Sequence, residues 1–155
     1  MTSLKSIQAM MLPLIPDDYK TDIETDIDLC VYGSNQASVL INKQFTILSE
    51  RNTTDDGNEV VEYSIEEDLN SFEIYLCAMC SYKAYLIRLK DEFNRDAINF
   101  KTLTFEIKSL EKRPEAINDS IYSINKDINS LVSQITGSNS LCGVAKMFSK
   151  NGYFN

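Results

Sequence analysis

The sequence predicts a mainly α-helical protein: a helical bundle around a long helical hairpin, with a small β-hairpin insert and an extended C-terminal tail. Three observations predict this class. Residues 64–98 keep one apolar face with no Pro or Gly between its members, residues 114–136 repeat Ile and Leu at helical spacing, and residues 38–63 hold two β-prone runs around a turn. We assign residues 1–137 to a single helical domain and residues 138–155 to a tail that docks on a neighbouring molecule.

Two short helices are predicted before the insert. The first covers residues 4–12, where Leu, Ile, Met and Ala gather, and it should stop at Pro13. Pro16 suits the first position of the second helix, because a proline there loses no intrahelical hydrogen bond. The apolar side of the second helix is formed by Tyr19, Ile23, Ile27, Cys30 and Val31. This helix should end at Gly33-Ser34-Asn35.

The insert begins with residues 38–49, which fit either a strand or a helix. Apolar residues alternate in this segment as they do in a strand, yet the segment also fits a helical period. A turn cluster follows at residues 52–58, with Asp56-Gly57 inside it, and β-prone residues return at 60–63. Two such runs around a turn favour a β-hairpin with an acidic tip in solvent.

The long helical hairpin has its own start and stop signals. Ser64 followed by Glu67 has the pattern of a capping box, so the first long helix should start there. Its apolar face should contain Ile65, Leu69, Phe72, Leu76, Met79, Leu86, Phe93 and Ala97. The second long helix should run from Pro114 to a stop at Gly137. It should pack through a seam formed by Ile117, Ile121, Ile124, Ile128, Leu131 and Ile135. Residues 99–106 break the helical period and should form a short extended link.

The chain is acidic, and its charge is uneven. Its 155 residues include 23 acidic and 15 basic side chains, and this balance argues against a protein whose main task is to bind nucleic acid. Residues 55–68 hold seven acids and no base, whereas residues 83–113 hold eight bases and five acids. Such a distribution can orient copies of the chain, although solvated helix faces are the simpler explanation. No apolar run approaches the roughly 18 residues of a membrane span, so we expect a soluble protein made in a cytoplasm.

The residue types that usually carry catalysis are sparse. The chain has no histidine, which excludes Ser-His and Cys-His nucleophile arrangements. Cys77 and Cys80 have a spacing that suits zinc or redox chemistry, but they fall inside a helix, so we expect buried, unreactive thiols. The carboxylates of residues 22–28 alternate around a helix instead of converging, so we expect no metal site there. We therefore expect no enzyme, no catalytic residue and no cofactor.

The joint between the two long helices carries a resemblance. It has the order of a long amphipathic helix, then Asp96-Ala97-Ile98-Asn99-Phe100-Lys101-Thr102 with Phe105 after it, then a last helix. This order resembles the head–tail connector proteins of tailed bacteriophages, the adaptor or head-completion family, over residues 16–135. The resemblance implies a structural protein of the virion neck, made in the bacterial host. It implies a ring of about twelve copies below the portal that bridges capsid and tail and lets DNA pass.

The resemblance also implies partners: further copies of the chain, the portal protein and other neck or tail proteins, with DNA only passing through and no membrane. Contacts with them are expected at the tip of the insert and in the tail, at Asp55, Asp56, Gly57, Leu141, Val144, Met147, Phe148, Tyr153 and Phe154. The alternative is a small acidic helical interaction module or regulator, which binds one protein through its apolar seam.

Overall fold

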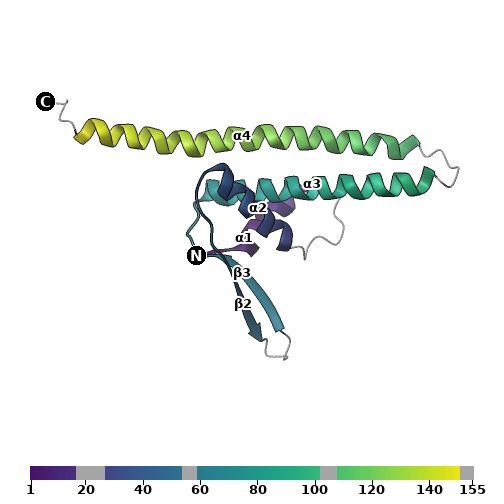
Figure 1. Cartoon of the computed structure of the whole chain (residues 1–155), viewed down its shortest axis with the longest axis horizontal. Helices are drawn as coiled ribbons and strands as arrows, with labels where there is room; N and C mark the ends of the chain where they lie inside the picture. The colour runs from purple at the N-terminus through teal and green to yellow at the C-terminus, as the bar shows by residue number, and fades with distance from the viewer. Residues whose placement is uncertain (17–26, 54–58, 102–107, 151–155) are drawn as a thin grey trace.

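The computed structural model describes residues 1–16, 27–53, 59–101 and 108–150, and for residues 59, 96–101, 108–114 and 138–150 it gives the secondary structure alone. Figure 1 shows two long helices, α3 (Ser71–Lys101) and α4 (Lys108–Lys150), lying side by side. Helices α1 (Leu4–Met11) and α2 (Ile27–Leu40) pack against α3 on the side away from α4. A ribbon of β2 (Ile47–Thr53) and β3 (Glu59–Ile65) extends away from the helices. The predicted class, mainly α with a β-hairpin insert, is confirmed.

The N-terminal segment forms a short strand and then the helix that residues 4–12 predicted. Strand β1 (Thr2–Ser3) leads into α1, and the Ser3 hydroxyl oxygen caps the helix by accepting the N–H of Lys5 at 3.3 Å. Pro13 lies in the 3-10 turn η1 (Leu12–Leu14) that follows the helix. The buried face of α1 consists of Leu4, Ile7 and Met11.

The sequence predicted that helix α2 ends at Gly33-Ser34-Asn35, and this prediction is wrong. The helix continues to Leu40. Gly33 lies where α2 crosses α3, and a Cβ there would lie 2.1 Å from Ser81 Oγ and 2.5 Å from Ser81 N. The glycine therefore permits a close helix contact instead of ending the helix. The chain leaves the helix at Asn42, whose φ of 50° is the left-handed conformation that asparagine tolerates. The predicted start of this helix lies outside the described residues.

The insert is a β-hairpin, as the turn cluster predicted, but its first strand starts later than expected. Strand β2 pairs antiparallel with β3 from Ile47↔Ile65 to Thr53↔Glu59, while residues 38–40 complete α2. The β1 strand pairs with the base of β3 through Thr2↔Ile65 and Ser3↔Ser64, so the strand order is β1-β3-β2.

Helix α3 starts at Ser71, seven residues after the predicted start. A capping box does begin it, but the box is Asn70 and Glu73: Asn70 Oδ1 accepts the N–H of Glu73 at 3.0 Å, and Glu73 Oε2 accepts the N–H of Asn70 at 2.9 Å. Ser64 is instead paired inside β3. Of the predicted apolar face, Ile65 belongs to the strand and Phe72 is 60% exposed, whereas Leu69, Leu76, Met79 and Leu86 are buried.

Helix α4 starts at Lys108 and continues to Lys150, so neither Pro114 nor Gly137 marks an end. Pro114 is the seventh residue of α4, where a proline removes one hydrogen bond and disfavours the helix, yet the helix continues through it. A glycine lowers helix propensity without forcing a stop. The predicted seam is confirmed, because Ile117, Ile124, Ile128, Leu131 and Ile135 are buried and Ile121 is half-buried. Of the predicted extended segments, residues 99–101 and 138–150 are helical. The rest of the link and tail lies outside the described residues.

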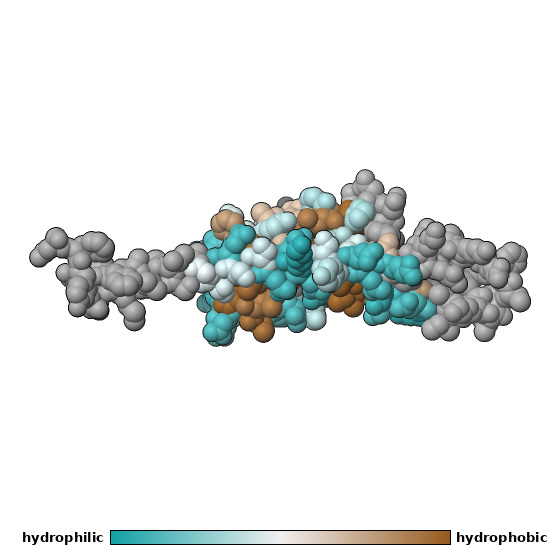
Figure 2. All heavy atoms as spheres, turned by 90° about the horizontal axis from the view of Figure 1, so that it is seen from above, coloured by the Kyte–Doolittle hydropathy of each residue, from teal (hydrophilic) through white to brown (hydrophobic). Residues whose placement is uncertain are grey.

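Figure 2 views the molecule from the α4 side. Hydrophilic side chains cover most of the outward face of α4, and separate hydrophobic patches lie on its flanks. None of the helices in the described parts is long and apolar enough to cross a membrane.

Candidate interaction surfaces

The β2–β3 ribbon has open edges along most of its length. Strand β2 is the last strand of the sheet, so no described strand pairs with its outer edge. Strand β3 pairs with β1 only at Ser64 and Ile65, which leaves its outer edge open over residues 59–63. Because open edges present unpaired backbone N–H and C=O groups, they are templates for pairing with another chain.

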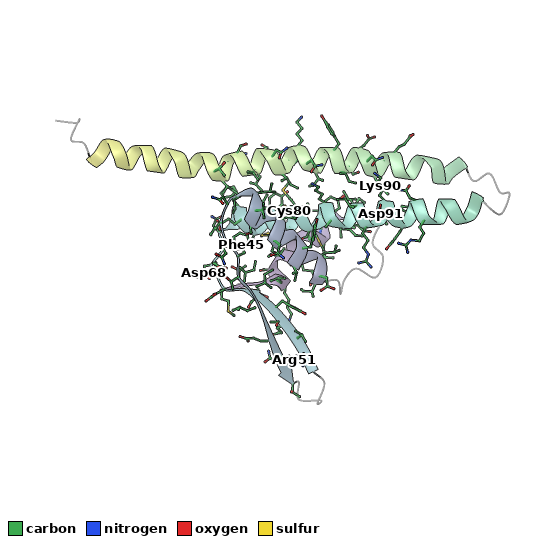
Figure 3. The ribbon with its side chains drawn as sticks, viewed as in Figure 1. Phe45, Arg51, Asp68, Cys80, Lys90 and Asp91 are labelled. Carbon is green, nitrogen blue, oxygen red and sulfur yellow. The ribbon has the colours of Figure 1, made fainter. Side chains whose placement is uncertain are left out.

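Both faces of the ribbon are also exposed. Val60 and Val61 point to opposite faces, since side chains alternate along a strand, and they are 39% and 43% exposed. Arg51, directly opposite Val61, is exposed, and Figure 3 shows it well away from the helices. Glu50 and Glu62 lie directly opposite each other, and like charges in that position destabilise a hairpin. The outer ribbon therefore has no core of its own.

The base of the ribbon, in contrast, is fixed to the helical body. Phe45 and Ile65 are buried there, and Figure 3 shows Phe45 where the ribbon joins the body. The Glu67 carboxylate accepts the N–H of Thr46 at 2.8 Å and its hydroxyl at 3.0 Å. The Thr2 hydroxyl accepts the N–H of Leu69 at 2.9 Å. These bonds tie the residue before β2, and strand β1 beside the base of β3, to the turn before α3.

Three carboxylates at this base carry lowered pKa values. The backbone N–H of Thr46 lowers the pKa of Glu67. The Lys5 ammonium, 2.5 Å from Glu62 Oε1, lowers the pKa of Glu62 through its hydrogen bond and its charge. The N-terminal amine does the same to Asp68. Each contact favours the ionised carboxyl, so the base of the ribbon is held best near neutral pH.

A shallow groove between α2 and α3 is a second candidate surface. It encloses about 530 Å³ and is lined by Tyr32, Ala84, Ile87, Arg88, Asp91, Glu92 and Arg95. Its charges are mixed, and Arg88 Nε lies 3.3 Å from Glu92 Oε1. Because its cations and anions balance, the groove favours neither an anionic nor a cationic ligand.

Cys30, Cys77 and Cys80 are buried and form no disulfide with one another. Burial raises the pKa of the Cys77 thiol to about 12 and that of Cys80 to about 11. Both thiols are therefore protonated and unreactive, as the sequence predicted. Within the residues that the structure describes, no group of three or more His, Cys, Asp or Glu side chains has a metal-binding arrangement.

Of the predicted contact residues, only those before residue 151 in α4 belong to a described element. Asp55, Asp56 and Gly57 lie outside the described residues, in the gap of the sequence between Thr53 and Glu59. Leu141, Val144, Met147 and Phe148 belong to the last part of α4, whereas Tyr153 and Phe154 are not described. Sequence reasoning missed Arg51, Val60 and Val61. The alternation in β3 was visible, but nothing in the sequence indicated that the strand edges stay open.

No family model matches the sequence, and comparisons with curated proteins and solved structures find no significant similarity. The described geometry is a helical hairpin on a small α/β base, with a β-ribbon attached to that base. The ribbon edges are the part of the described sheet that no described strand covers.

Proposed function

We propose that the chain is a structural subunit of the head–tail connector of a tailed bacteriophage, an adaptor that forms a ring below the portal. One observation carries the proposal: two elements extend out of the folded body. They are the β2–β3 ribbon and the C-terminal part of α4, which runs past the start of α3 in Figure 1.

The lengths of the two long helices support this proposal. At 1.5 Å per residue, the 43 residues of α4 span about 65 Å and the 31 residues of α3 about 46 Å. Among the residues of α4 whose burial the structure describes, Ile135 is the last buried one, and the helix continues over residues 138–150 for about 20 Å. A helix gains most of its stability by packing an apolar face, so this extension is expected to pack against a partner.

The ribbon supports the same conclusion independently. A two-stranded hairpin is at best marginally stable in water without a third strand or a helix to cover it. This ribbon keeps seven residue pairs, although only its base contacts the body. Two unlike surfaces on one chain form heterologous contacts, and such contacts generate rings when the rotation closes. The acidic charge of −8 suits a ring around DNA, because like charge discourages phosphate binding.

The test is to produce the full chain together with the portal protein of the same phage and to examine the complex by native mass spectrometry and electron microscopy. We expect a ring of about twelve copies on the portal. Deleting residues 141–155 should abolish attachment while the far-ultraviolet circular dichroism keeps a folded helical signal. A truncated chain that still assembles on the portal would contradict the proposal. So would a single copy bound to a single partner, which would instead indicate the interaction module.

A further inference from the structure

We propose that neighbouring copies join their ribbons edge to edge, so that the outer edge of β3 in one copy pairs with the outer edge of β2 in the next. This inference rests on the ring proposed above and names the residues that join its subunits. Rotation about a ring axis repeats the ribbon with the same face outward and brings the two unlike edges together. The strands β3 and β2 that then meet run antiparallel, as they do within the hairpin.

The open edge of β3 is slightly shorter than that of β2, so all of it can be paired. Strand β3 offers residues 59–63 beyond its short pairing with β1, and β2 offers all of Ile47–Thr53. Opposed residues must lie on the same face of a sheet, so the allowed registers differ in steps of two residues. The register used inside the hairpin would place Glu62 opposite Glu50 of the next copy, which sets two carboxylates against each other.

A register offset by two residues removes this repulsion and still pairs all of residues 59–63. On one face it sets Val61 opposite Ser49 and Tyr63 opposite Ile47 of the next copy. The second is an aromatic residue paired with a β-branched residue, a type of pair that stabilises neighbouring strands. An offset in the other direction pairs only residues 61–63, because β2 ends at Thr53 and β1 already occupies Ser64 and Ile65 at the base of β3.

The offset has a geometric consequence as well. When each copy shifts the register by two residues, the stagger accumulates around the ring in one direction. A sheet that closes on itself requires such a stagger, since its strands must tilt relative to the axis. The ribbons of a complete ring then form a closed sheet with no open edge, which removes the aggregation hazard of the monomer.

Disulfide capture between chains tests the register. One chain carries Val61→Cys and the other Ser49→Cys, both with Cys142→Ser, and the two are mixed, assembled with the portal protein and oxidised. We expect the mixed dimer to form at least about tenfold more than from Val61→Cys with Thr53→Cys, since position 53 lies beyond disulfide reach in this register. Equal yields from the two mixtures would overturn the inference, while a ring in the micrographs would keep the proposed function. Absence of both ring and cross-link would overturn both.

Discussion

The crossing of α2 and α3 is so close that replacing Gly33 with alanine should destabilise the protein. A Cβ at this position would lie 2.5 Å from the backbone N and 2.7 Å from the Cα of Ser81. Rotating the Ser81 side chain relieves only the contact with its Oγ, because the other two atoms belong to the backbone. The two helices must therefore move apart by about 0.9 Å to restore ordinary contact.

The size of the effect follows from two opposed contributions. Overpacking a core typically costs about 1–3 kcal/mol, and we take the upper end because the backbone of α3 blocks the new methyl group. Alanine offsets about 1 kcal/mol of this cost, since it favours a helix more than glycine does. The expected net loss is about 2 kcal/mol, or a Tm lower by about 4–8 °C for a chain of this length.

The chain contains a matched control for this measurement. Gly137 also lies inside a helix, but a Cβ there would meet nothing within 4 Å. Gly137→Ala should therefore raise the free energy of unfolding by about 0.5–1 kcal/mol through helix propensity alone. Thermal and urea unfolding followed by circular dichroism compares the two variants. If Gly33→Ala were as stable as Gly137→Ala, the close crossing would be refuted. If adding Ser81→Ala restored the full stability of Gly33→Ala, the destabilisation would come from the Ser81 hydroxyl and not from the backbone of α3.

Three further predictions concern other parts of the body. Lys43→Met should lower the free energy of unfolding by about 1–2 kcal/mol in urea titrations, because it leaves the buried Glu73 carboxylate without the ammonium 2.7 Å away. Glu73→Gln should lower the free energy of unfolding by less, and a larger loss for Glu73→Gln than for Lys43→Met would contradict this account. The folded pKa of Glu67 lies below its ordinary value of 4.5, so the stability that Glu67 contributes is present above pH 4.5 and is lost as the pH falls through the lower folded pKa. Acid titration should therefore destabilise wild type more steeply than Glu67→Gln. If the unfolding free energies of the two proteins fell in parallel with pH, this contribution would be excluded. Cys77 and Cys80, with pKa values of about 12 and about 11, should react with a thiol reagent only as fast as the protein opens. In a Cys142→Ser chain their labelling should accelerate in denaturant, and rapid labelling of these two residues in the native state would disprove their burial.

The long seam was predictable from sequence because one local property decides it. Isoleucine and leucine repeat along α4 at steps of three and four, and packing against α3 uses that same face. The start of α3 was not predictable in this way. Two capping boxes of the same form lie six residues apart, Ser64 with Glu67 and Asn70 with Glu73, and local propensity does not choose between them.

Tertiary pairing makes that choice. Ser64 is engaged with Leu48 of β2 and Ser3 of β1, and Glu67 accepts both donors of Thr46, so the first box is occupied by the sheet. These partners come from parts of the chain far away in sequence, which no local pattern reports. Gly33 was misread for the same reason, since a helix stop and a helix crossing both favour glycine.

The candidate surface depends on the same pairing. If α3 started at Ser64, the base of β3 would be helical, and β1 would lose Ser64 and Ile65, the two residues with which it pairs. The ribbon would then be a short loop on a helical bundle. Because the sheet holds residues 64 and 65 instead, the ribbon is attached to the core through fully buried Ile65 and through Glu67 on Thr46. The base of the ribbon is therefore held to the helical body by the same contacts in every copy. The ring proposed above requires contact surfaces that are arranged alike in every subunit, and the late start of α3 is compatible with this requirement.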